Sequence, residues 1–203
     1  MVRTRQPIIK SMEKYRNSGG SAALQRGFTL IELLMTMAIL VILLAIGAPQ
    51  LQTFLIQRTV DSQAEAFAAS VRLARSEAIK RGVRVSMCAS ADPAAAVPVC
   101  AAAGAADWSQ GWLVWVDDAA PARSYNAGET IVKVQQAFNS SGSIASNGGA
   151  AVISFTQNGM ALASFASFQV HPHLTGSQAT EAANNRCVVL SVAGRVQINK
   201  GAC

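Results

Sequence analysis

Charged side chains are scarce in this chain of 203 residues, at 14%, which is low for a freely soluble domain. Motifs for common catalytic chemistry are missing: we find no G-x-S-x-G elbow, no phosphate-binding glycine loop and no histidine-rich metal motif. The two histidines, His171 and His173, flank Pro172 and are interpreted as surface-loop residues rather than a metal pair. Asp117-Asp118 follows an expected strand and is explained more simply by a turn. These absences argue against an enzyme, a metal site and a bound cofactor.

Acidic residues are outnumbered, at 11 against 17 Lys and Arg, which gives a formal net charge of +6. A basic chain suggests a nucleic-acid or lipid partner until the charge is located. Six of the cations precede Phe28, opposed only by Glu13, so the chain from Phe28 onward carries a net charge of about +1. The basicity therefore belongs to the leader and is no argument for nucleic-acid binding.

Residues 28–48 form an apolar run with one ionisable side chain, Glu32. Its length matches a bilayer core of roughly 30 Å, which predicts a transmembrane helix. An ordinary secretory signal peptide is the alternative, since small residues at 45, 47 and 48 could mark a cleavage site. However, the run is longer than a typical signal core, and a carboxylate near the bilayer centre costs very roughly 3 kcal/mol. Cations concentrated before the run place the amino end in the cytoplasm and the rest outside it.

Glu32 has no Lys or Arg within the apolar run to pair with it. An ionisable group in a membrane segment indicates a cationic partner or a function, and the nearest candidate is a new amino terminus made by cleavage before Phe28. The stretch Arg26-Gly27-Phe28-Thr29-Leu30-Ile31-Glu32 resembles the class III signal of type IV pilins and type II secretion pseudopilins. This resemblance implies that a prepilin peptidase cuts after Gly27 and methylates Phe28. It also implies that Glu32 pairs with the amine of a neighbouring subunit.

The helix is expected to continue beyond the apolar run. A single apolar stripe at spacings of four and three is formed by Val60, Ala64, Phe67, Val71, Ala74 and Ala78. A helix over residues 28–81 would be about 80 Å long. Pro49 lies in its course, and a proline inside a helix removes a hydrogen bond and bends the backbone, so we expect a kink there.

Residues after Gly82 form short β-rich runs separated by Gly, Asn, Ser and Pro, the pattern of an antiparallel sheet. One helix followed by strands predicts an α+β domain. The expected strands are 84–89, 112–117, 130–137, 152–155, 164–170, 187–192 and 195–198, and loops are expected at 91–107 and 139–150.

Four cysteines, Cys88, Cys100, Cys187 and Cys203, all follow the expected membrane segment, where oxidation is permitted. Three pairings are possible, and proximity in sequence favours Cys88 with Cys100 and Cys187 with Cys203. Zinc is the competing interpretation, but no C-x-x-C is present and the spacings are irregular.

A second resemblance is carried by residues 71–82 (VRLARSEAIKRG), Val85, Cys88, Asp107-Trp108, Gly111-Trp112 and Asp117, which look like the GspH/FimT family of minor pseudopilins. It implies a pilin-like fold: a long helix, half transmembrane, packed on an antiparallel β-sheet domain. The implied organisation is a cleaved leader at 1–27, a membrane half of the helix at 28–48, an amphipathic half at 49–82 and a periplasmic domain at 83–203. Trp108, Trp112 and Trp115 are interpreted as core or interface residues, and Arg75 and Glu77 as polar contacts of the helix.

The family resemblance implies a minor subunit of a type IV pilus or a type II secretion pseudopilus, at or near the filament tip. The subunit would wait in the bacterial inner membrane, and its partners would be the prepilin peptidase, membrane lipid and other major and minor subunits. The RLARSEAIKRG and DWSQGW stretches look more like FimT-type members, which favours the pilus.

DNA capture is the alternative function. Some FimT-like proteins bind DNA through a Gly-Arg-x-Arg motif, and the corresponding stretch here, Gly194-Arg195-Val196-Gln197, lacks the second arginine. A small patch of Arg195, Lys200 and Arg186 would offer few phosphate contacts and therefore weak, salt-sensitive binding. The simpler alternative is a hairpin turn beside a solvated arginine.

Overall fold

The computed structural model describes residues 27–102, 107–138, 141–162, 166–172 and 184–203. The chain forms two compact units, Met1–Leu44 and Ala45–Cys203. Residues 1–26 of the expected leader, and His173, lie outside the described residues.

One helix, α1 (Leu30–Arg81, 52 residues), contributes to both units. In the first unit, every side chain from Leu30 to Leu44 is exposed, although nearly all of them are apolar. Among the described residues, α1 is the one helix long and apolar enough to cross a membrane by its length and composition. The helix assignment continues through Pro49 without interruption. The kink at Pro49 stays a prediction.

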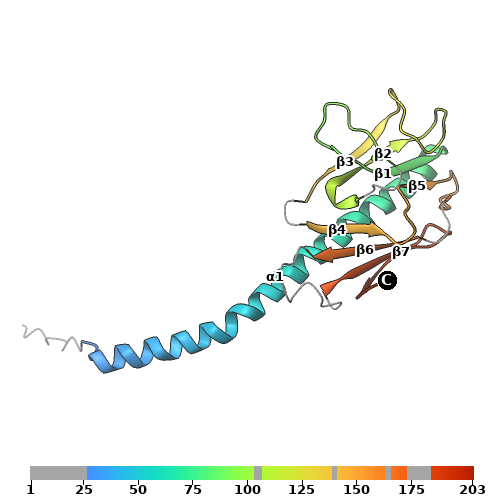
Figure 1. Cartoon of the computed structure of the whole chain (residues 1–203). Helices are drawn as coiled ribbons and strands as arrows, with labels where there is room; N and C mark the ends of the chain where they lie inside the picture. Colours follow the sequence, from blue (N-terminus) through green and yellow to red (C-terminus); the bar gives the residue numbers. More distant parts are fainter. Residues whose placement is uncertain (1–26, 103–106, 139–140, 163–165, 173–183) are drawn as a thin grey trace, which may run out of the picture. The chain divides into compact units, whose positions relative to one another are not determined.

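The second unit contains two four-stranded antiparallel sheets (Figure 1). One has the order β3-β2-β1-β5 and is built from β1 (Val85–Ala89), β2 (Gly111–Val116), β3 (Ile131–Gln136) and β5 (Val152–Phe155). The other has the order β4-β6-β7-β8 and is built from β4 (Ser141–Ser146), β6 (Ala166–Pro172), β7 (Arg186–Leu190) and β8 (Val196–Lys200). A short 3-10 helix, η1 (Trp108–Gln110), precedes β2. The α+β class is confirmed, and all seven expected strands are present, 152–155 with the predicted ends and the other six with ends shifted by one or two residues.

The loop predicted over residues 139–150 is wrong, because strand β4 lies within it and pairs with β6. This strand is built almost entirely from Ser, Gly and Ala, which carry no β signal of their own. Its one large apolar side chain, Ile144, is fully buried opposite Val170. His171 is likewise a half-buried residue of β6 rather than a surface-loop residue.

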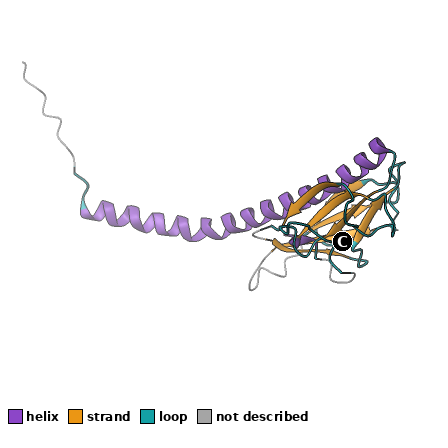
Figure 2. Ribbon diagram, turned by 90° about the horizontal axis from the view of Figure 1, so that it is seen from above, coloured by secondary structure: helices purple, strands orange, loops and turns teal. Residues whose placement is uncertain are grey.

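The predicted apolar stripe of α1 is confirmed, since all six of its members are at most 1% exposed. The strands gather along this part of the helix (Figure 2), and the core includes residues from both sheets. At its centre the Phe67 ring lies 5.3 Å from Trp108 and 5.4 Å from Trp112, edge to face, and 4.9 Å from Phe168 of the second sheet. The three tryptophans are fully buried, as expected.

A smaller core covers the other face of the β3-β2-β1-β5 sheet. Cys88, Leu113 and Trp115 are fully buried there, packed by Tyr125 and Val152. Because one face of this sheet meets α1 and the other meets this smaller core, every residue of β1 and β2 is buried. Such strands lose the alternation typical of a half-exposed sheet.

Candidate functional site

The expected cleavage site, Gly27 and Phe28, lies outside any helix or strand, just before α1. The Phe28 side chain is 81% exposed. A Cβ added at Gly27 would meet nothing within 4 Å among the described residues. The described structure therefore does not require a glycine at this position. Any requirement for glycine must come from a partner that recognises the segment.

Thr29 caps the start of α1. The backbone N–H of Glu32 donates to Thr29 Oγ1 at 3.2 Å, and the N–H of Leu33 donates to the Thr29 carbonyl at 3.1 Å. Thr29 and Glu32 thus occupy the first and last positions of a T-x-x-E capping box, a signal that is visible in the sequence and that our sequence analysis missed. The cap explains why the helix begins at Leu30 and not at Phe28.

The Glu32 side chain is exposed, and within the described residues no cation forms an ion pair with it. A carboxylate in the first turn is favourable for the helix dipole, which is a local role. That role does not explain why the residue interrupts an otherwise apolar membrane-length run, where a carboxylate is expensive.

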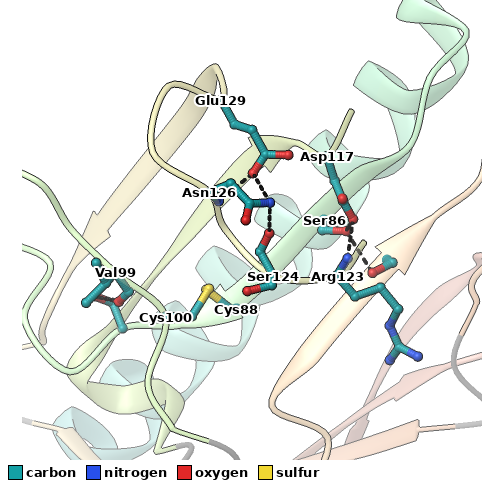
Figure 3. The surroundings of a disulfide bond; sticks show 11 residues. Ser86, Cys88, Val99, Cys100, Asp117, Arg123, Ser124, Asn126 and Glu129 are labelled. Carbon is teal, nitrogen blue, oxygen red and sulfur yellow. Dashed lines mark hydrogen bonds between the residues drawn. A yellow bond between two sulfur atoms is a disulfide. The ribbon is translucent and has the colours of Figure 1, made fainter. Parts of the chain in front are cut away.

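Both disulfides have the pairing that sequence proximity favours. Cys88 is bonded to Cys100, which packs against the smaller core (Figure 3). Cys187 of β7 is bonded to Cys203 and fastens the carboxyl end beside the β7-β8 hairpin.

Asp117 anchors the loop between β2 and β3 and has no exposed surface in its side chain. Its carboxylate accepts from Arg84 Nε at 2.8 Å and Nη2 at 3.2 Å. It also accepts from Ser86 Oγ at 2.6 Å and from the backbone N–H of Arg123 at 3.0 Å (Figure 3). Glu129 holds the same loop through the backbone N–H groups of Ala119 and Asn126. These partners assign Asp117 to loop structure, in agreement with the turn interpretation.

The predicted cationic patch is wrong in one member. Arg186 is 4% exposed; it forms an ion pair with Asp61 of α1 and donates from Nη1 to the Asn185 carbonyl. Its partner lies 125 residues away in sequence, so no local pattern predicts this burial. Arg195 and Lys200 are exposed, at opposite ends of β8, about 16 Å apart along extended chain. They do not form one compact site.

Arg195 instead lies beside two arginines of α1, Arg72 and Arg75. All three line a cavity of about 400 Å³ in the second unit. Sequence analysis placed Arg75 only as a polar contact, and its Nε does donate to the Gly159 carbonyl at 3.0 Å. The grouping was missed because topology, not sequence spacing, brings residue 195 to the helix.

Glu77 was also expected to make polar contacts of the helix. Its carboxylate accepts from Arg81 Nε at 2.6 Å and lies 3.8 Å from Lys80 Nζ. The hydrogen bond from Arg81 and the charges of both cations lower the pKa of Glu77 from its ordinary value of 4.5, against a smaller opposing effect of burial.

Comparison with known families gives two matches. The family described as "Type II transport protein GspH" matches residues 63–194, well over half of the chain. The prokaryotic N-terminal methylation motif matches residues 23–48, which include Gly27, Phe28 and Glu32. No curated protein matches the chain significantly.

Among solved structures, the chain is similar to the type IV minor pilin FimU of Pseudomonas aeruginosa. In one crystal form the TM-score is 0.53 at 21% identity, covering 72% of this chain and 92% of FimU. A second crystal form of the same pilin gives a TM-score of 0.48 at 21% identity, covering 68% and 91% of the two chains. At this identity the likeness concerns the fold, and it confirms the expected pilin-like architecture of one helix and antiparallel sheets.

Proposed function

The chain belongs to the GspH family and is a minor pilin or pseudopilin of a type IV pilus or a type II secretion system, and from this premise we propose how it enters its filament. The family and fold are those of structural subunits, not enzymes. Membership also implies assembly with other pilins or pseudopilins and processing by a prepilin peptidase.

In the proposed route the subunit waits in the inner membrane, with residues 28–48 across the bilayer and the β domain, residues 83–203, in the periplasm. Prepilin peptidase cuts between Gly27 and Phe28 and methylates the new amine. An exposed Phe28 outside any helix or strand, followed shortly by a capped helix, supports an accessible cleavage site. Within the described residues, neither Gly27 nor Phe28 belongs to a helix or strand that would have to open before the peptidase acts.

The observation that carries this proposal is the isolated carboxylate of Glu32 within the methylation motif. Cleavage creates an ammonium group four residues before it. Each subunit then brings one cation and one anion into a low-dielectric environment, where an ion pair between neighbouring subunits offsets the cost of both charges. The filament contact would thereby compensate a charge that is unfavourable in the lone membrane-anchored subunit.

The test replaces Glu32 by Gln and follows the chain in cells. Glu32→Gln removes the charge but keeps a residue that is equally suited to the capping box. We expect normal insertion and cleavage, and at least about a tenfold loss from sheared filaments, as for one lost charge-assisted contact. Detection uses immunoblots of filament and membrane fractions.

Thr29→Ala is the matched control, because it removes the cap and leaves the charge. If Thr29→Ala fails to enter filaments while Glu32→Gln assembles normally, assembly requires the capped helix start and not the charge of Glu32, and the charge-pairing role is wrong. Gly27→Leu should leave the precursor uncleaved, although the described structure accommodates a side chain there. Normal processing of that variant would refute the assigned cleavage site.

We place the subunit at or near the filament tip, because minor subunits of this family are expected to begin or cap a filament rather than build its length. Immunogold labelling of intact filaments should then mark one end. Labelling along the whole length would contradict the tip position.

DNA binding stays the second candidate function. The burial of Arg186 weakens the case for it, because this arginine is not available to a phosphate. Only Arg195 and Lys200 of the predicted patch remain exposed. Each contact between a cation and a phosphate adds modestly to the binding affinity, and salt weakens that contribution. Two separated cations therefore support weak DNA binding at most.

A further inference from the structure

The cavity beside Arg195 lies between the last turns of α1 and the hairpin that joins β7 to β8. Its charged lining consists of Arg72, Arg75 and Arg195, and its apolar lining includes Ile79 and Val196. Of the residues that the structure describes, none with a carboxylate or an aromatic ring lines it. The cavity therefore combines three guanidinium groups with an apolar wall.

Arg75 is held in place by two turns. Its Nε donates to the Gly159 carbonyl, and both Gly159 and Gly194 have positive φ angles, of 75° and 74°. A Cβ at Gly194 would lie 2.2 Å from the Gly159 carbonyl oxygen and 2.9 Å from Arg75 Nε, so only glycine permits this packing. The other N–H groups of the Arg75 guanidinium make no hydrogen bond to a described residue.

Arg195 lies at the end of the turn between β7 and β8, and hydrogen bonds to Ser191 fix its backbone. Its backbone N–H donates to Ser191 Oγ at 3.1 Å, and its carbonyl accepts from the Ser191 N–H at 3.0 Å. The side chain is exposed and forms no ion pair within the described part of the chain. The turn thus fixes the backbone and leaves the guanidinium group available.

Arg72 has a weak internal partner. Its Nη1 lies 3.7 Å from Glu65 Oε2, and the two side chains are 53% and 65% exposed. An ion pair this exposed contributes little, so a better placed anion can replace it.

We propose that this cavity binds a carboxylate side chain, Asp or Glu, of a neighbouring filament subunit. The proposal rests on the filament function above. Guanidinium groups match the two oxygens of a carboxylate, and arginine is favoured over lysine in protein interfaces. Ile79, which is 52% exposed on α1, supplies apolar surface for the rest of the partner segment. Contact there would bury a hydrophobic side chain that the isolated subunit leaves in water.

The lining favours a peptide over DNA for two reasons. Strands of nucleic acid are bound by extended tracks of cations, often with aromatic rings on which bases stack. Here the arginines form one compact group, with Glu65 beside Arg72, and no aromatic ring from the described residues lines the cavity.

The experiment uses the full chain in detergent micelles and fluorescence anisotropy with three labelled probes. These are a short synthetic peptide with two glutamates, the same peptide with glutamines, and a short single-stranded oligonucleotide. We expect saturable binding of the glutamate peptide, and about tenfold or more weaker binding of the glutamine peptide, the loss typical of a charge-assisted hydrogen bond. Arg195→Gln and Arg75→Gln should each weaken binding of the glutamate peptide by a similar factor.

Arg58→Gln is the matched control, because Arg58 is an exposed arginine of α1 stacked on Phe54 and does not line the cavity. It should bind the glutamate peptide as the unmodified chain does. Arg195→Gln keeps the test decisive if Arg75→Gln disturbs the packing of the turns.

Three results would overturn the proposal. They are equal binding of the two peptides, no binding of any probe, and oligonucleotide binding that the arginine variants lose when the glutamate peptide does not bind. The last result would assign the cavity to DNA. Filament fractionation distinguishes failure of the cavity proposal from failure of the filament function. If the chain enters filaments but binds no peptide, only the cavity proposal is wrong. If the chain is absent from filaments, the filament function is wrong.

Discussion

Two stretches of the same helix behave differently in the structure. From Leu30 to Leu44, α1 is apolar on every side and wholly exposed. Between Val60 and Ala78, six apolar residues at spacings of four and three form one stripe that is at most 1% exposed, under two sheets. Apolar residues on every side of a helix therefore indicate a surface for lipid or other helices, whereas a single apolar stripe indicates a helix that builds a domain core.

Two carboxylates, those of Asp117 and Glu32, differ in burial and in whether the chain itself supplies their partners. Asp117 is fully buried, and Arg84, Ser86 and a backbone N–H satisfy it within its own unit. Glu32 is exposed and has no cation among the described residues. A carboxylate whose partners are all present is structural, whereas one left without a cation in an apolar run indicates a partner from outside the chain.

The largest expected effect on the free energy of unfolding comes from a substitution in the buried stretch of α1. Phe67→Ala should lower the free energy of unfolding of the second unit by about 3 to 5 kcal/mol, because it removes a ring from the centre of a close-packed core. Denaturant titration of the full chain in detergent, followed by tryptophan fluorescence, measures this.

Leu40→Ala in the exposed stretch is the matched control and should leave the same transition unchanged within about 0.5 kcal/mol. A comparable loss from Leu40→Ala would show that the two stretches are not separate in function, and the comparison would fail.

A smaller effect separates the two carboxylates. Asp117→Asn should lower the free energy of unfolding by about 2 kcal/mol, because Arg84 loses its charged partner but is itself 31% exposed and keeps access to water. Asp118→Asn, at the exposed neighbour, should change it by no more than about 0.5 kcal/mol. Glu32→Gln should leave this transition unaltered, and a loss equal to that of Asp117→Asn would make Glu32 a structural residue.

The smallest effect concerns the solvent-facing side of the second stretch. The pKa of Glu77 is lowered below 4.5 in the folded chain, so its contribution to stability is present above that pH and is lost as the pH falls through the folded value. Glu77→Gln should therefore slightly reduce the stability lost on acidification. The check compares thermal unfolding midpoints of the two chains at neutral pH and below pH 4.5, and a larger acid loss in the variant would contradict the sign.

Sequence analysis predicted the elements whose side chains carry a strong periodic signal. The stripe from Val60 to Ala78 was predicted in full, because one-sided burial of a helix leaves a clear spacing. Strand β4 was missed because its small and polar residues resemble a loop, and only pairing with β6 makes it a strand. The number of sheets also depends on such pairings.

The candidate site was predictable where it is local and unpredictable where it is assembled from distant residues. Gly27, Phe28 and Glu32 lie within six residues of one another, and both disulfides join neighbours in sequence. In contrast, Arg186 meets Asp61 across 125 residues, and Arg195 meets Arg72 and Arg75 only through the fold. Tertiary contacts of this kind decide whether an arginine is a structural partner or an available cation.

The central claim is that this chain enters a filament through a new amino terminus at Phe28. Mass spectrometry of the amino-terminal peptide from sheared, washed filaments tests it most directly. The account predicts a peptide that begins at Phe28 and carries one methyl group on its amine. Filaments that contain the chain with residues before Phe28 still attached would contradict it.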